Sequence, residues 1–152
     1  MTDKLMKVQR IEHGTVIDHI LPGMAFDVLR VLGLSNERSM SILINSHSNK
    51  GGKKDILKIE DVELSGDEAS RVALVSPHAT INIIVDGQVV RKFNAEAPDV
   101  VRGILSCSNP NCISNQNEPV TTEFRLRPDA GHRYVCAYCE RDVVDLARRI
   151  RG

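Results

Sequence analysis

The chain has 152 residues, which is enough for one domain or two small ones. Its 20 basic and 20 acidic residues cancel, so no global field draws it to nucleic acid or to an anionic membrane. Aromatic residues make up only 3%, which argues against base-stacking platforms. No apolar run approaches the ~20 residues that span a bilayer, which argues against a membrane protein.

The first part of the chain alternates between strand and helix patterns. A β-branched, apolar run predicts the first strand, and Pro22-Gly23 ends it. Apolar residues three or four apart then predict a helix that stops close to Gly33. The predicted segments are strand 8–21, helix 24–34, strand 41–45, polar loop 47–54 and strand 55–64. Leu57 and Ile59 should share one face of the last strand, with Ile56, Lys58 and Glu60 on the other.

Two local signals are sharper. Ser65 and Glu68 fit a capping box, so a helix should begin there and run to about Val75, before Ser76-Pro77. Asp86-Gly87 separates two β-branched runs and tolerates the positive φ of a type I′ turn. We therefore expect a hairpin of strands 80–85 and 88–93.

The order β-α-β-β-α-β, with one further strand from the hairpin, predicts an α+β fold. We expect a ferredoxin-like sandwich, with two helices on one face of a mostly antiparallel sheet, over residues 1–98. The segment 94–98 has the composition of a linker. Residues 99–152 should form a second, small all-β domain of the zinc-ribbon kind, with strands 100–105, 120–126 and 133–135 and a short amphipathic helix in 142–150.

All four cysteines lie in this second part, as Cys107-x4-Cys112 and Cys136-x2-Cys139. Two close pairs are the usual way to hold one tetrahedral metal ion, and four thiolates leave no position for water or substrate. We therefore expect a structural zinc ion, with iron as the alternative. The domain has few apolar residues for its size, so the ion should supply folding energy.

Two disulfides are the other interpretation of the four cysteines. The start of the chain, residues 1–5, lacks an apolar stretch of signal-peptide length. We therefore expect the chain to stay in the reducing cytoplasm, where this cysteine pattern favours metal. A redox pair at Cys136 and Cys139 would leave the other two cysteines unexplained.

Asp18-His19 stands inside an otherwise apolar strand, and alternation should place the two side chains on opposite sides. One interpretation is a solvated strand end or edge. The other is a polar ligand contacted by Asp18, His19 and Lys58, because aspartate suits ribose hydroxyls and lysine suits phosphate. Lys92, at the end of the hairpin, could add a second charge facing phosphate.

Several stretches together resemble the regulatory chain of aspartate carbamoyltransferase, from about Val8 to Asp145. The most specific are Gly14-Thr-Val-Ile-Asp-His-Ile20 and Cys107-Ser-Asn-Pro-Asn-Cys-Ile-Ser114. The others are Lys54-Asp-Ile-Leu-Lys-Ile-Glu60, Ala79-Thr-Ile-Asn82, Val89-Val90-x-Lys92, Glu118-Pro-Val120 and Cys136-x-Tyr-Cys-Glu140.

The resemblance implies a non-catalytic regulatory subunit in pyrimidine synthesis, with CTP as inhibitor and ATP as its competitor. The N-terminal domain would bind these effectors and form a homodimer, and the zinc domain would dock onto the catalytic chain. The implied effector-site residues are Ile11, Val16, Asp18, His19, Ile56, Lys58, Asn82, Ile84, Val89 and Lys92. The implied zinc ligands are Cys107, Cys112, Cys136 and Cys139, and the implied contacts to the catalytic chain are Asn109, Asn111, Glu140 and Arg141.

The chain departs from this pattern at the hairpin turn and in a short N-terminal arm. The best-known members carry an aromatic residue near the base, whereas this chain has Asp86-Gly87. Either departure could alter base preference. A function of another class is a zinc-ribbon adaptor for nucleic acid or transcription, favoured by the cysteines and the basic tail 148–151 but opposed by the zero net charge and the few aromatic residues.

Overall fold

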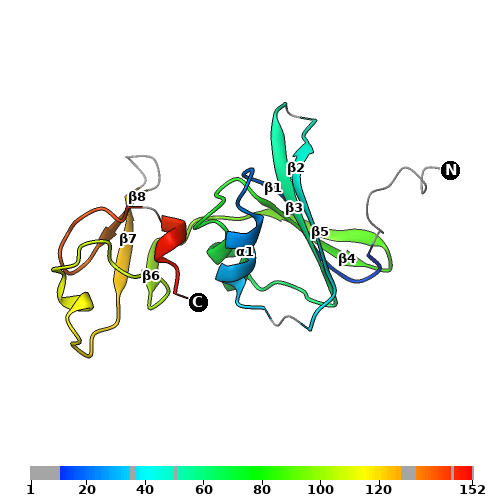
Figure 1. Cartoon of the computed structure of the whole chain (residues 1–152). Helices are drawn as coiled ribbons and strands as arrows, with labels where there is room; N and C mark the ends of the chain where they lie inside the picture. The colour runs from blue at the N-terminus through cyan, green and yellow to red at the C-terminus, as the bar shows by residue number, and fades with distance from the viewer. Residues whose placement is uncertain (1–10, 35–36, 50, 128–132, 145, 152) are drawn as a thin grey trace.

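The computed structural model describes residues 11–34, 37–49, 51–127, 133–144 and 146–151. A five-stranded and a three-stranded sheet form two lobes (Figure 1), and the predicted α+β class is confirmed. No helix in the described part of the chain is long and apolar enough to cross a membrane. The elements are β1 (Gly14–Ile20), α1 (Ala25–Leu32), β2 (Met40–His47), β3 (Lys53–Glu60), α2 (Gly66–Val72), β4 (Thr80–Val85), β5 (Gln88–Asn94), β6 (Val100–Arg102), β7 (Glu123–Arg127) and β8 (Arg133–Cys136).

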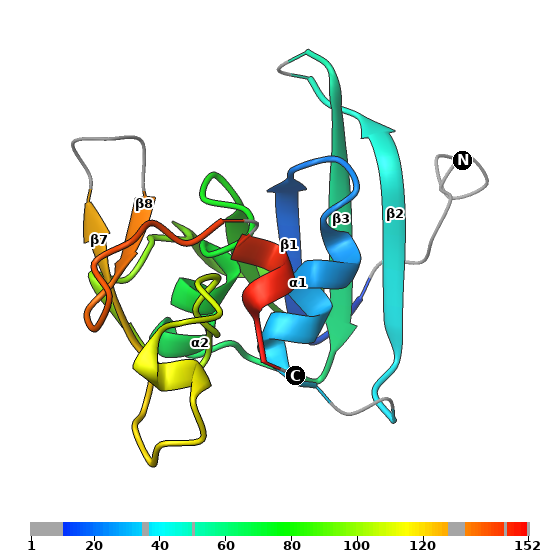
Figure 2. The same cartoon turned by 60° about the vertical axis from the view of Figure 1, so that its left-hand side comes forward.

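The larger sheet has the order β2-β3-β1-β4-β5, and every neighbouring pair is antiparallel. Figure 2 shows α1 and α2 on the same side of this sheet. The face under the helices is apolar and buried, because alternate strand residues point toward it. Its core consists of Ile17, Ile20, Leu57, Ile59, Ile81 and Ile83 from the strands, with Val28, Leu32, Ala69 and Val72 from the helices. The other face of the sheet is left open for a site.

The capping box and the hairpin turn both form as predicted. The Ser65 hydroxyl accepts a hydrogen bond from the Glu68 amide, and the Glu68 carboxylate accepts one from the Ser65 amide. The helix that begins here ends at Val72, a few residues before the predicted end. At the hairpin, φ is positive at both Asp86 (52°) and Gly87 (75°), which is the geometry of a type I′ turn.

The start of α1 is capped by Asp55, a residue of the distant strand β3. It is fully buried in β3, and its Oδ2 accepts hydrogen bonds from the backbone amides of Gly23 (2.9 Å) and Ala25 (3.1 Å). Its Oδ1 accepts one from the amide of Asn45 at 2.9 Å. Met24, at the cap position of the helix, provides no side-chain cap. Asp55 therefore caps α1 and ties three segments together.

The strand β1 contains a bulge that corrects one prediction. The pairing of β1 with β3 shifts between Ile17 and Ile20, and both isoleucines are fully buried on the core face. Because His19 takes a left-handed backbone conformation (φ 58°), the chain gains an extra residue between them. Asp18 and His19 therefore do not face opposite sides: His19 Nδ1 lies 3.9 Å from Asp18 Oδ2, and both side chains are partly exposed.

Other differences are small shifts of boundaries. The strand β3 begins at Lys53 rather than at Asp55 and ends at Glu60, so the polar loop is shorter than expected. The strand β2 extends to His47 because it pairs with this longer β3. The strand β1 begins at Gly14 and ends at Ile20, so residues 11–13 and Leu21 of the predicted strand lie outside it, and the predicted residues 8–10 lie outside the described part.

The C-terminal lobe contains the sheet β6-β7-β8, which packs around Phe124, Tyr134 and Leu105. β6 is shorter than predicted, because Gly103 turns the chain with a φ of 73°. The expected amphipathic tail helix is a four-residue 3₁₀ helix, Leu146–Arg149. The tail makes long-range backbone bonds, since the Arg149 carbonyl accepts from the Ser106 amide and the amide of Arg151, after the helix, donates to the Ile104 carbonyl.

The 3₁₀ helix of the tail also joins the two lobes. It lies beside α1 in both views (Figures 1 and 2). Arg30 Nη2 on α1 donates a hydrogen bond to the Ala147 carbonyl at 2.6 Å and forms an ion pair with Asp27 at 2.7 Å. The C-terminal segment is therefore in direct contact with the N-terminal lobe.

Candidate functional site

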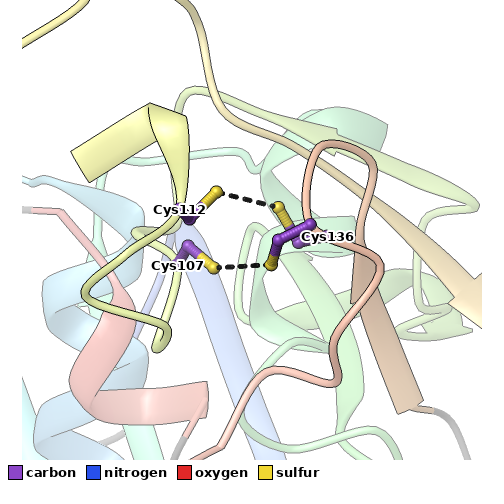
Figure 3. Close-up of side chains that lie close together, drawn as sticks. Cys107, Cys112 and Cys136 are labelled. Atoms are coloured by element: carbon purple, nitrogen blue, oxygen red, sulfur yellow. Dashed lines mark hydrogen bonds between the residues drawn. The ribbon is translucent and has the colours of Figure 1, made fainter. Parts of the chain in front are cut away.

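The four cysteine side chains converge at one end of the C-terminal lobe. Their sulfur atoms all lie within 4.8 Å of one another, although the two pairs come from separate loops. Figure 3 shows Cys107 and Cys112 on one side and Cys136 on the other, with the sulfurs directed toward the centre. The spacing in the sequence predicted this convergence.

The first cysteine loop is held by its own asparagines. The Cys107 sulfur accepts a hydrogen bond from the Asn109 amide at 3.5 Å, and the Asn109 carbonyl accepts from the Cys112 amide at 3.0 Å. Asn115, in a 3₁₀ helix that follows Cys112 (Ile113–Asn115), donates through its side chain to the carbonyls of Cys107 and Asn109. These bonds turn the chain tightly enough for both sulfurs to point inward.

The second loop follows β8, where Cys136 is the last strand residue. The Glu140 amide donates to the Cys136 carbonyl at 2.9 Å, and the Cys136 amide donates to the Arg141 carbonyl at 3.0 Å. Glu140 takes a left-handed conformation (φ 62°), which closes the turn around Cys139. Each pair of cysteines thus occupies a preformed turn.

The sulfur positions fit a tetrahedral ion and do not fit disulfides. The Cys107–Cys139 and Cys112–Cys136 sulfurs are 3.6 Å and 3.7 Å apart, far longer than the ~2.05 Å of a disulfide. A tetrahedron with metal–sulfur bonds of ~2.3 Å has edges of ~3.8 Å. Three of the four cysteines are buried. The cluster can therefore hold one metal ion with a closed thiolate shell, which suits a structural role.

The thiols differ in acidity when no ion is present. Burial raises the pKa of Cys107 to about 12 and also raises the pKa of Cys136. Burial acts in the same direction on Cys139, but hydrogen bonds from the Arg141 backbone and the Asn109 side chain outweigh it and lower the pKa to about 7. Binding of a divalent ion must therefore displace protons from Cys107 and Cys136, so affinity should increase with pH.

A second site lies on the open face of the five-stranded sheet. It is a pocket of about 300 Å³, a size at the lower end for small-molecule sites. Strands β1, β3, β4 and β5 and the segment before β1 contribute to it. Its lining residues are Ile11, Val16, Asp18, Lys58, Asn82, Ile84, Gly87 and Val89.

A cross-strand row of side chains forms the floor of this pocket. Val16 is paired with Lys58 on β3 and with Asn82 on β4, and Asn82 is paired with Lys92 on β5. Residues directly opposite each other in a sheet share a face, so both lysines stand on the open side. Three strand spacings separate them, or about 14 Å. The pocket is thus flanked by two cations, neither with an ion-pair partner among the described residues.

Asp18 does not stand free at the edge of this pocket. Its Oδ1 lies 2.9 Å from Lys54 Nζ, and both side chains are partly exposed. Lys54 and His19 line a smaller, neighbouring pocket of about 210 Å³, together with Lys53 and His78. The ion pair of Asp18 with Lys54 therefore links the main pocket, which Asp18 lines, to the smaller pocket, which Lys54 lines and which we call the basic pocket.

Seven of the ten expected effector-site residues line the main pocket. His19 lines the basic pocket instead, Lys92 stands beside the main pocket opposite Asn82, and Ile56 lies further along β3 without lining either pocket. The expected effector-site residues did not include Lys54, nor Gly87, although the turn Asp86-Gly87 was expected near the base. The Asp-Gly turn placed Gly87 at the hairpin tip, and Lys54 has the same parity as Lys58 on β3, so both could have been found from the strand pattern.

The residues expected to contact a partner lie on the two cysteine loops. Asn111, Glu140 and Arg141 are exposed, whereas Asn109 is half buried. The Asn109 side chain is occupied internally, because its Oδ1 accepts from the Asn111 amide at 3.1 Å. Three of these four positions are therefore accessible on the cysteine loops.

Comparison with known proteins assigns both lobes. Residues 6–96 match the family of the aspartate carbamoyltransferase regulatory chain, allosteric domain, and residues 99–145 match the metal binding domain of the same chain. The chain is 44% identical to the aspartate carbamoyltransferase regulatory chain of Methanothrix thermoacetophila, over 95% of this chain and 96% of the relative. It is 49% identical to that of Methanopyrus kandleri, over 91% and 90%. It is 48% identical to that of Pyrobaculum arsenaticum, over 91% and 93%.

The two family matches follow the order of the two lobes, and the similarity covers nearly the whole length of these relatives. Both findings assign the chain to the same family. The five-stranded lobe corresponds to the allosteric domain, and the lobe with the cysteine cluster corresponds to the metal-binding domain. The chain therefore belongs to the aspartate carbamoyltransferase regulatory chain family.

Proposed function

We propose that this chain is a non-catalytic subunit that binds CTP and ATP on its five-stranded sheet and transmits their effect to catalytic chains. The observation that carries the proposal is the pocket on the open sheet face, with its cross-strand row from Lys58 to Lys92. Apolar side chains at one end suit a base, and carboxylate and amide groups near the middle suit a ribose.

The phosphates would extend toward the basic pocket. Lys53, Lys54, His19 and His78 line it, and lysine binds phosphate as a point charge. Lys54 would then exchange its contact with Asp18 for one with phosphate, which frees Asp18 for a ribose hydroxyl. Effector binding would thereby change the contacts at the bulge of β1.

We propose residues 1–98 as the effector domain and residues 99–152 as the assembly domain, a division supported by the family matches that end at 96 and begin at 99. The assembly domain would carry one zinc ion, since four thiolates in a tetrahedral arrangement are typical of structural zinc. Its exposed loops, with Asn109, Asn111, Glu140 and Arg141, would contact the catalytic chain. The chain would act as a homodimer in the cytoplasm.

Control of activity follows from linkage. A nucleotide can shift the catalytic chains only if it binds two states of the assembly with different affinity, and the coupling is reciprocal. In this structure the contact between Arg30 and Ala147 offers one physical connection between the effector lobe and the tail of the assembly lobe.

The test is calorimetric titration of the metal-loaded chain with CTP, with cytidine as the control ligand. We expect saturable CTP binding that is at least ten-fold weaker in Lys58→Ala, because a charged contact to phosphate or ribose is worth ~1.5–3 kcal/mol. Arg91→Ala is the matched control: Arg91 pairs with Ile83, so it lies on the helix-covered face of the sheet. Equal CTP affinity in both variants would contradict the assignment of the pocket.

The regulatory role needs the assembled enzyme. Aspartate saturation curves of the complex with catalytic chains should shift with CTP or ATP, and Lys58→Ala should remove the shift without changing activity in the absence of nucleotide. A curve that no nucleotide moves, in a complex that does bind CTP, would reject transmission while leaving the binding site intact.

A further inference from the structure

A carboxylate that is not among the lining residues stands next to the hairpin end of the main pocket, and the effector site described above does not use it. Its hairpin end is lined by Ile84, Gly87 and Val89. Glu12 lies next to this end: its carbonyl accepts a hydrogen bond from the Gly87 amide at 2.9 Å. Its two carboxylate oxygens lie 3.5 Å and 3.8 Å from the position that a Cβ on Gly87 would occupy. Figure 1 shows the segment before β1 alongside the tip of the β4–β5 hairpin.

Because Gly87 has no side chain, no atom of this residue fills the space next to the Glu12 carboxylate. Any larger residue at this turn would begin in van der Waals contact with the Glu12 carboxylate. Gly87 also has a φ of 75°, which other residues adopt only at a cost. Glu12 itself is exposed and has no hydrogen-bond or ion-pair partner for its carboxylate among the described residues. The neighbouring Asp86, in contrast, faces His13 at 3.7 Å.

The charges of the two ends fix the direction of a nucleotide. Lys53, Lys54 and two histidines lie at the far end, whereas Glu12 lies at the hairpin end. On β1, Gly14 lies at the hairpin end and Asp18 at the basic end. The four-residue step between them spans about 13 Å along the strand. A triphosphate at the basic end therefore puts the base beside Ile84 and Gly87, within reach of Glu12.

We propose that Glu12 selects the base, favouring bases that present an amino group and guanine above all. An ionised carboxylate only accepts hydrogen bonds, so it needs a donor on the base edge. Guanine offers two adjacent donors, N1–H and the 2-amino group, to the two carboxylate oxygens. Cytosine and adenine offer one amino group. Uracil offers only its N3–H, which lies between two carbonyl oxygens that repel a carboxylate. The proposal rests on nucleotide binding at the main pocket, and it adds guanine nucleotides to the ligands of this chain.

The experiment measures the affinities of GTP, CTP, ATP and UTP for the metal-loaded chain by calorimetry, in wild type and in two variants. Glu12→Ala should weaken GTP about ten-fold, as expected for loss of a bidentate pair. It should weaken CTP and ATP about three-fold and leave UTP unchanged or slightly tighter. Glu12→Gln adds a donor, so it should weaken GTP but tighten UTP. Asp86→Asn is the control: it removes one charge from the same turn and should change all four affinities equally.

The results separate this inference from the proposed function. A crossover, with GTP weakened and UTP strengthened by Glu12→Gln, supports base selection, because loss of a negative charge alone would tighten every triphosphate. Uniform changes across the four nucleotides, or none, would overturn the role of Glu12 while leaving the pocket as an effector site. Absence of binding by any nucleotide to the folded wild-type chain would overturn both.

Discussion

Replacement of Asp55 tests whether one buried carboxylate holds the N-terminal lobe together. Asp55 is fully buried and accepts three backbone hydrogen bonds, from Gly23, Ala25 and Asn45. The bond to Ala25 is buried, and those to Gly23 and Asn45 are partly buried. Asp55→Ala leaves these three amides without their acceptor, and water can reach only the amides of Gly23 and Asn45.

The magnitude follows from these three contacts. The buried Ala25 amide should cost ~1–3 kcal/mol when it loses its acceptor, and each partly buried amide ~1 kcal/mol. Loss of a negative charge at the start of α1 adds up to ~1 kcal/mol. We therefore expect Asp55→Ala to lower the free energy of unfolding by about 4 kcal/mol, which corresponds to a Tm lower by roughly 10 °C. Asp55→Asn keeps the shape and one oxygen, so it should lose about half as much.

The assay is urea unfolding of the metal-loaded chain, followed by far-ultraviolet circular dichroism. Asp67→Ala is the matched control, because Asp67 is an exposed aspartate in the first turn of α2 and should cost at most ~1 kcal/mol. If Asp55→Ala and Asp67→Ala lower the free energy of unfolding by the same amount, the three hydrogen bonds of the Asp55 carboxylate do not stabilise the lobe as proposed. A lower midpoint with an unchanged m-value would show a loss of stability without a change in the surface exposed on unfolding.

Three further predictions concern the metal, a helix cap and a buried tyrosine. Cys112→Ser should unfold the C-terminal lobe and abolish assembly with catalytic chains while CTP binding persists; assembly that survives complete metal removal would contradict this. Ser65→Ala should lower the free energy of unfolding by about 1 kcal/mol in urea titrations, because the capping box is lost. A cost near zero would mean that the α2 start is held by packing. Burial raises the pKa of Tyr134 above its usual value near 10, so wild type should lose stability as pH rises above about 10, and Tyr134→Phe should lack this loss. Parallel stability curves for the two proteins between pH 9 and 11 would refute it.

Local chemistry in the sequence determined much of this protein. The Ser65 and Glu68 box, the Asp86-Gly87 turn and the αL glycine at position 33 each act within a few residues, so their patterns predict the structure directly. The two cysteine pairs are also local, and one tetrahedral site lets both pairs share an ion. Strand alternation likewise separated the core residues from those that line the open face.

Contacts between distant segments were decided by the tertiary structure alone. Asp55 caps a helix 30 residues away, because the sheet brings β3 under the start of α1. The bulge at His19 breaks the alternation that sequence reasoning relied on, since burial of both Ile17 and Ile20 outweighs regular pairing. Lys54 meets Asp18, and Glu12 meets Gly87, only after strands far apart in the chain pair. Burial of the apolar face and the register of the sheet select these contacts, and neither can be inferred from the neighbouring residues of the chain.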